Sequence, residues 1–127
     1  DEEIKQKVIK FTPNILLLNP PYKSDKKNDI EEMEFVLNGL NMLSKGGIGV
    51  AIIPLSSVIE NKKEKIELKK QLLNNHTLEA VFSMPDELFY NSKVSVNTCV
   101  IVVRAKEPHP KGYKTFFGYF KDDGFTK

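Results

Sequence analysis

Two short apolar runs, each stopped by a proline, constrain the fold of this chain most strongly. Residues 14–18 are apolar after their first position and stop before Pro20, and residues 48–53 are apolar and stop at Pro54. A continuous apolar run too short for a helix is typical of a strand buried on both faces, as in a parallel sheet. We therefore expect two fully buried strands in an α/β domain.

Helical patterns follow both predicted strands. Apolar residues recur at helical spacing over residues 29–44, after an Asp-x-x-Glu capping pattern that begins at Asp29. A second, lysine-rich helix is predicted over residues 61–74, with Asn61 as its cap.

Further strands are predicted over residues 78–83 and 96–103, and a short fifth strand over residues 115–119. No helical pattern separates the first two of these, so we expect them to form an antiparallel hairpin. The predicted fold class is α/β, with a mostly parallel sheet covered by helices on both faces and a terminal antiparallel hairpin. We expect residues 1–127 to form a single domain, with the tail from about residue 107 leaving the core.

The composition excludes several classes of function. The 19 Lys and Arg residues exceed the 17 Asp and Glu residues by too little to indicate nucleic-acid binding on their own. Arg104 is the only arginine, which leaves little scope for bidentate reading of guanine. The single cysteine, Cys99, lies in an apolar run and cannot form a disulfide framework. With no signal peptide and no apolar run near 20 residues, we expect a soluble, cytoplasmic protein with no membrane contact.

A rigid polar corner follows the first predicted strand. Its sequence is Asn19-Pro20-Pro21-Tyr22, here called the NPPY corner. Open α/β sheets bind their ligands at such carboxyl ends of strands. Proline fixes its own φ and keeps the preceding residue out of the helical region. The corner can therefore direct the Asn19 side chain and the Pro20 carbonyl to one point, with the ring of Tyr22 beside it.

Two hydrogen-bond acceptors beside an aromatic ring suit an amino group on a planar base, which has two N–H donors and a stacking face. Adenine has such an amino group. Its nitrogen is a poor nucleophile because the lone pair is delocalised into the ring. Binding both hydrogens favours a pyramidal nitrogen with a freed lone pair, so the site needs no strong general base.

The NPPY corner resembles the catalytic tetrapeptide of S-adenosylmethionine-dependent amino methyltransferases, above all the N6-adenine DNA methyltransferases. Protein-glutamine and ribosomal-RNA guanine methyltransferases carry the same four residues. Three downstream runs are similar to the methylation subunit of type I restriction-modification systems: LSKGGIGVAIIP (residues 43–54), LEAVFSMPDELFYNSKVSVNTCVIVVRAK (residues 78–106) and FFGYFKDDGFTK (residues 116–127). The resemblance implies a partial Rossmann-like methyltransferase fold.

The resemblance also implies roles for the corner. Asn19 and the Pro20 carbonyl would hold the target amino group, with Pro21 completing the rigid catalytic motif. Tyr22 would stack on an adenine flipped out of double-stranded DNA. Asn19 is also the residue of this chain expected to contact the cofactor, S-adenosylmethionine. The implied reaction transfers a methyl group from this cofactor to N6 of adenine.

Other candidate residues have two interpretations. Phe89, matched by its loop position only, either contacts the opposite face of the base or packs its loop onto the sheet. Lys23, Lys26 and Lys27 either contact DNA phosphates or are solvated surface residues. Neither histidine has a companion at ligand spacing, so we expect no metal site.

The main cofactor loop of this family, a glycine-rich turn after a strand, precedes the tetrapeptide. Residues 1–13 do not match it. Gly46-Gly47-Ile48-Gly49 follows a predicted helix and precedes a strand, the reverse of the required order, so we interpret the glycines as a helix stop. The resemblance therefore implies the C-terminal half of a catalytic domain, with the main cofactor loop upstream.

The resemblance implies specificity and restriction subunits of the same system as partners, and an open sheet edge would allow self-association. Two alternatives stay open. One is a methyltransferase that acts on RNA or on a protein glutamine. The other is a catalytically silent interaction module that keeps the corner as a scaffold.

Overall fold

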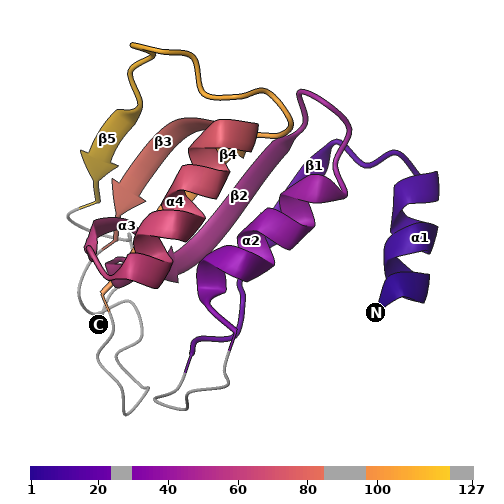
Figure 1. Ribbon diagram of the computed structural model, residues 1–127, viewed down its shortest axis with the longest axis horizontal. Helices are drawn as coiled ribbons and strands as arrows, with labels where there is room; N and C mark the ends of the chain where they lie inside the picture. Colours follow the sequence, from indigo (N-terminus) through magenta and orange to yellow (C-terminus); the bar gives the residue numbers. More distant parts are fainter. Residues whose placement is uncertain (24–29, 85–96, 121–127) are drawn as a thin grey trace.

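The computed structural model describes residues 1–23, 30–84 and 97–120 of the 127-residue chain. They form a five-stranded sheet with helices packed against it (Figure 1). In chain order the elements are α1 (Glu2–Lys10), β1 (Ile15–Leu18), α2 (Glu32–Asn41), β2 (Ile48–Pro54), α3 (Ser56–Ile59), α4 (Lys63–Asn75), β3 (Thr77–Ser83), β4 (Thr98–Arg104) and β5 (Phe116–Tyr119). In these described ranges, no helix has the length and apolar character needed to cross a membrane.

Strand β4 makes the sheet mixed. The strand order is β1-β2-β4-β3-β5, in which β1 is parallel to β2 and β3 is parallel to β5, whereas β4 is antiparallel to both of its neighbours. The expected mostly parallel sheet is therefore wrong. The antiparallel pairing of β3 with β4 is confirmed, but the pair is central rather than terminal. β4 is apolar at most positions, and a central place buries more of that surface than an edge would.

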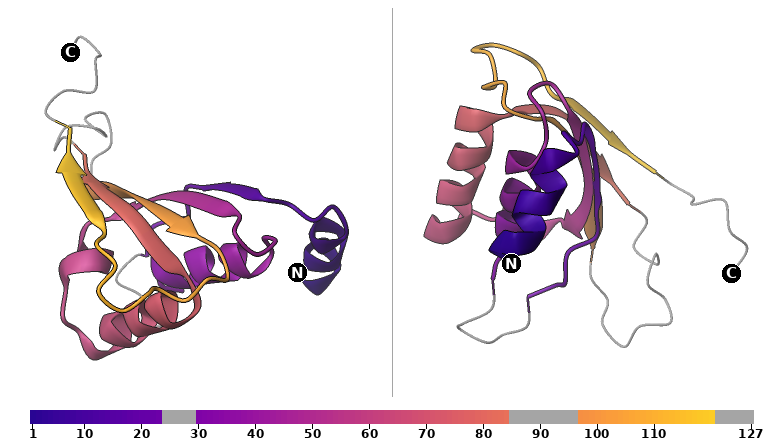
Figure 2. Two further views of the ribbon diagram at one scale, coloured as in Figure 1. Left: turned by 90° about the horizontal axis from the view of Figure 1, so that it is seen from above. Right: turned by 90° about the vertical axis from the view of Figure 1, so that its right-hand side faces the viewer.

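Helices α2 and α4 cover the same face of the sheet, as both views in Figure 2 show. For the described residues, the expectation of helices on both faces is therefore wrong. The buried core between the helices and the sheet comprises Met33, Val36, Leu37, Leu40, Leu43, Ala51, Ile53, Leu68, Leu72, Val81, Cys99, Ile101, Val103 and Ala105.

Strand β1 is half-exposed rather than fully buried. Leu16 and Leu18 pack against the core, whereas Ile15 and Leu17 are 67% and 77% exposed. Alternate residues of a strand point to opposite faces, and α2 covers only one of these faces. β1 also lies at the edge of the sheet, where it pairs with β2 on one side. The apolar run was therefore a correct signal for a strand but a wrong one for burial on both faces.

Both predicted helices form, as α2 and α4, with different starting points. α2 begins after Glu31, and the predicted cap Asp29 lies outside the described residues. α4 begins after Lys62, whose side chain makes no capping hydrogen bond. Asn61 is thus one residue too early to be the cap, and that prediction is wrong.

The two glycines after α2 form the turn into β2. α2 already ends at Asn41, so they do not stop the helix directly. Gly46 has a φ of 83°, in the left-handed region that favours glycine. A Cβ on Gly47 would lie 2.9 Å from the Asn14 carbonyl oxygen. The absence of a side chain at this turn lets the start of β2 approach the start of β1.

Two further helices were not predicted from the sequence. α1 lies apart from the sheet, beyond the β1 edge (Figure 1), and none of its residues is buried. Asp1 caps it by accepting a hydrogen bond from the Glu3 N–H at 2.8 Å. The four-residue α3 is too short to produce a periodic apolar pattern.

After β4 the chain passes the start of β3 and then returns to the sheet. The Thr77 hydroxyl donates a hydrogen bond to the Glu107 carbonyl at 2.7 Å, and the Thr115 hydroxyl donates to the Leu78 carbonyl at 2.9 Å. β5 then pairs with β3, which confirms the predicted fifth strand. The segment after residue 107 therefore rejoins the sheet at the edge opposite β1.

Candidate functional site

The NPPY corner lies at the carboxyl end of β1. Because β1 and β2 are parallel, with Leu18 opposite Ala51, the corner is beside the C-terminal part of β2. β4 begins at this same edge, where Thr98 pairs with Pro54. The fold thus places the corner at the edge where α/β sheets bind ligands.

Exposure alternates along the corner. Asn19 is exposed, Pro20 is buried, Pro21 is exposed and Tyr22 is partly buried. The buried proline fixes the corner to the body of the domain. The Asn19 side chain is left accessible, as an amine-binding role requires.

Tyr22 is oriented with its hydroxyl group inward. The phenol oxygen is buried while the residue as a whole keeps part of its surface exposed. Burial raises the pKa of the Tyr22 phenol, and nearby Cys99 and Glu32 raise it further. The phenol therefore stays neutral at physiological pH.

Two glutamates at the start of α2 hold the residue after the corner. The Lys23 N–H donates a hydrogen bond to Glu32 Oε1 at 2.6 Å, and the Lys23 ammonium pairs with Glu31 at 2.7 Å. The second interaction raises the pKa of the Lys23 ammonium. In this conformation the lysine charge is directed toward Glu31.

The other predicted site residues are not all placed. Phe89, Lys26 and Lys27 lie outside the described residues. Glu32 was missed as a site residue, since the Asp-x-x-Glu pattern marked it only as part of a helix cap. Lys23 and Glu32 are nine positions apart in the sequence, and no local pattern predicts a contact between them.

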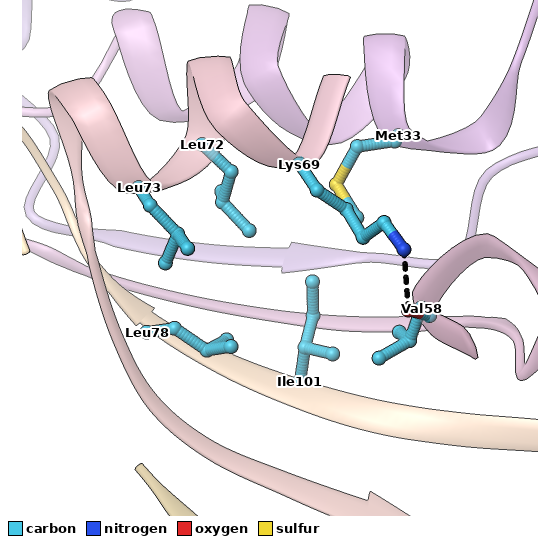
Figure 3. A pocket seen from close by; sticks show the side chains of 7 residues that line it. All are labelled: Met33, Val58, Lys69, Leu72, Leu73, Leu78 and Ile101. Carbon is cyan, nitrogen blue, oxygen red and sulfur yellow. Dashed lines mark hydrogen bonds between the residues drawn. The ribbon is translucent and has the colours of Figure 1, made fainter. Parts of the chain in front are cut away.

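A separate apolar pocket lies between the helices and the sheet (Figure 3). It has a volume of about 70 Å³. Its one charged residue, Lys69, donates a hydrogen bond to the Val58 carbonyl at 3.0 Å, so the ammonium is already engaged. The pocket is lined by Met33, Val58, Lys69, Leu72, Leu73, Leu78 and Ile101. It includes no residue of the NPPY corner and brings together no groups suited to catalysis.

In the part of the chain that the structure describes, no three His, Cys, Asp or Glu side chains are grouped so that they could hold a metal ion.

Comparison with known proteins identifies similar sequences. A family model described as N-6 DNA methylase matches residues 7–122. Among curated proteins, the type II restriction enzyme and methyltransferase RM.BcgI of Heyndrickxia coagulans is 36% identical over 114 residues. That match covers 87% of this chain but 18% of the relative, so the chain spans less than a fifth of the relative's length.

Solved structures share the fold. A putative class I S-adenosylmethionine-dependent methyltransferase from Listeria monocytogenes matches with a TM-score of 0.66 and 14% identity, over 87% of this chain and 38% of that one. A type I restriction-modification methyltransferase subunit from Streptococcus thermophilus matches with a TM-score of 0.61 and 20% identity, over 76% of this chain and 24% of that one. These matches confirm the predicted partial Rossmann-like methyltransferase fold.

Proposed function

Because this chain belongs to the N-6 DNA methylase family, we propose that its NPPY corner takes part in methyl transfer to N6 of adenine in DNA, within a restriction-modification system. The observation that carries the proposal is the arrangement of the corner. Asn19 is exposed at the carboxyl end of β1, while Pro20 is buried and fixes the backbone.

The corner acts by binding the target amine. The Asn19 amide oxygen and the Pro20 carbonyl oxygen each accept one N–H hydrogen bond from the amino group. Both acceptors are set in place before the substrate arrives, so little reorganisation is needed as charge develops on the nitrogen. The bound amine becomes pyramidal and its lone pair is available for attack.

Tyr22 holds the base. An adenine inside a duplex cannot reach the corner, so the base has to flip out, at a cost of a few kcal/mol. Stacking on an aromatic ring returns about 1 to 3 kcal/mol per base. The buried Tyr22 hydroxyl restrains the ring, which reduces the entropy lost when the base stacks.

S-adenosylmethionine is the proposed cofactor, and it supplies the electrophilic methyl group when bound. Among the described residues, Asn19 offers an exposed polar side chain at the edge where such a ligand would lie. This single side chain can make one contact with the cofactor, but it cannot form a complete cofactor site. We therefore assign only that contact to the residues of this chain.

Two more residues are proposed on the substrate side. Phe89 is assigned to the second face of the flipped base. Lys23 is assigned to a DNA phosphate, which requires its ammonium to leave Glu31, 2.7 Å away. That pair is partly exposed, so solvent screens the attraction that the lysine gives up when it turns to a phosphate.

The proposed partners are double-stranded DNA and the specificity and restriction subunits of the same system, in the cytoplasm. The buried free thiol of Cys99 is compatible with a reducing compartment. We also assign self-association to the β1 edge. Ile15 and Leu17 of this strand are exposed, and β1 pairs with another strand on one side only.

Transfer of a radiolabelled methyl group tests the substrate class. The whole protein is incubated with labelled S-adenosylmethionine and, separately, with duplex DNA, RNA and protein. We expect label in DNA, at N6 of adenine. Label in RNA or at glutamine would replace this function with the first alternative, and no label in any substrate would favour the silent module.

A further inference from the structure

Glu32 is a buried carboxylate that the proposed chemistry does not use. Its residue is 4% exposed, although it is the first residue of α2. Taking a carboxylate out of water is unfavourable unless hydrogen bonds and nearby positive charge compensate. The positive end of the α2 dipole supplies part of that compensation.

The hydrogen-bond donor to this carboxylate lies outside the helix. Glu32 Oε1 accepts the backbone N–H of Lys23 at 2.6 Å, a bond shortened by the negative charge of the acceptor. Lys23 directly follows Tyr22, so the bond fixes the backbone on the C-terminal side of the NPPY corner. Buried Pro20 fixes the backbone on the N-terminal side of the corner.

The neighbouring ion pair between Lys23 and Glu31 does not fix the backbone of the corner. Lys23 and Glu31 pair through long side chains that are 31% and 14% exposed. Such a pair restrains the lysine side chain rather than the backbone of the corner. The Glu32 bond, in contrast, acts on the peptide group next to Tyr22.

We propose that Glu32 is a positioning residue for methyl transfer, which holds Tyr22 in register with Asn19 by binding the Lys23 N–H. This role rests on the proposed function of the corner. A similar-sized apolar side chain at this position would avoid the cost of burying a charge. The carboxylate instead supplies the acceptor that the Lys23 N–H needs.

The test compares Glu32→Met with Glu32→Gln in the whole protein. Methionine fills the volume but removes the acceptor, whereas the glutamine amide oxygen can still accept the Lys23 N–H. Glu34→Ala is the matched control, because Glu34 is an exposed glutamate on the same turn of α2.

We measure kcat and KM for DNA methylation, the melting temperature, and the fluorescence of 2-aminopurine at the target position. Misplacing a catalytic group by about 1 Å can cost about 100-fold in rate. We therefore expect Glu32→Met to lower kcat by about 10- to 100-fold at a nearly unchanged KM for S-adenosylmethionine, with a flipped base that is less well stacked. Glu32→Gln and the Glu34→Ala control should keep a kcat within about threefold of that of the natural protein, a change well below the loss expected for Glu32→Met.

Three results would overturn the role: full kcat in folded Glu32→Met, equal losses in Glu32→Met and Glu32→Gln, or failure of Glu32→Met to fold. Asn19→Ala, assayed in parallel, separates this inference from the proposed function. If Asn19→Ala loses transfer while Glu32→Met keeps it, only the positioning role fails. If Asn19→Ala keeps transfer, the proposed function fails as well.

Discussion

At the scale of single residues, Tyr22 tests whether the ring or the hydroxyl matters. Tyr22→Ala removes the stacking surface and should weaken binding of a flipped base by about 1 to 3 kcal/mol, or about 5- to 150-fold in affinity. Tyr22→Phe keeps the ring and should have a much smaller effect. Single-turnover rates and DNA affinities of both variants decide the question, and equal losses would assign the role to the buried hydroxyl instead.

The corner was predictable because its four residues are contiguous. Their sequence determines a rigid turn, and the preceding strand determines where the turn lies. Glu32 was not predictable as a partner of Lys23, because the two residues are nine positions apart and no local sequence pattern links them. The inward Tyr22 hydroxyl also depends on packing near Cys99 and Glu32, which are distant in sequence.

At the scale of elements, the strands and the two main helices were predicted, but their surroundings were not. Apolar runs determined β1 and β2 because they are local signals. Which faces of the sheet the helices cover depends on tertiary contacts, and so does the insertion of β4 between β2 and β3. The exposed Ile15 and Leu17 illustrate this limit, because the sequence shows that they are apolar but not that α2 covers only their neighbours.

The end of α4 carries a pH-dependent contact. His76 follows the helix, is 1% exposed, and accepts the Lys106 N–H at Nδ1, 2.9 Å away. Burial, and then the charge of Lys106, lowers the pKa of His76 below 6.5. His76 therefore binds a proton more readily in the unfolded chain than in the folded chain. The contribution of neutral His76 to the free energy of unfolding should be fully present above pH 6.5 and should decrease as the pH drops below that value.

Urea unfolding at pH 7.5 and pH 5.5 measures this contribution, with His76→Gln as the comparison. The natural chain should lose more stability between the two pH values than the variant, because glutamine does not titrate. The same pH dependence in both proteins would show that His76 is not its source.

At the scale of the whole molecule, the described residues leave apolar surface at the β1 edge. An open strand edge with exposed apolar side chains favours pairing with another chain. We expect the 127-residue chain to self-associate in sedimentation velocity, and Leu17→Lys to shift it toward monomer. Ile59→Lys is the control, because Ile59 is 62% exposed in α3, away from that edge. A monomer at all concentrations would rule out the association.

The most direct test of the account is the single-turnover rate of methyl transfer to adenine N6 in duplex DNA by Asn19→Ala in the whole protein. Single-turnover conditions separate the chemical step from binding and product release. Removing one of the two fixed acceptors should slow the step by about 100- to 1,000-fold, as loss of a preorganised hydrogen bond does in other active sites. An unchanged rate would mean that the exposed Asn19 amide does not hold the target amine.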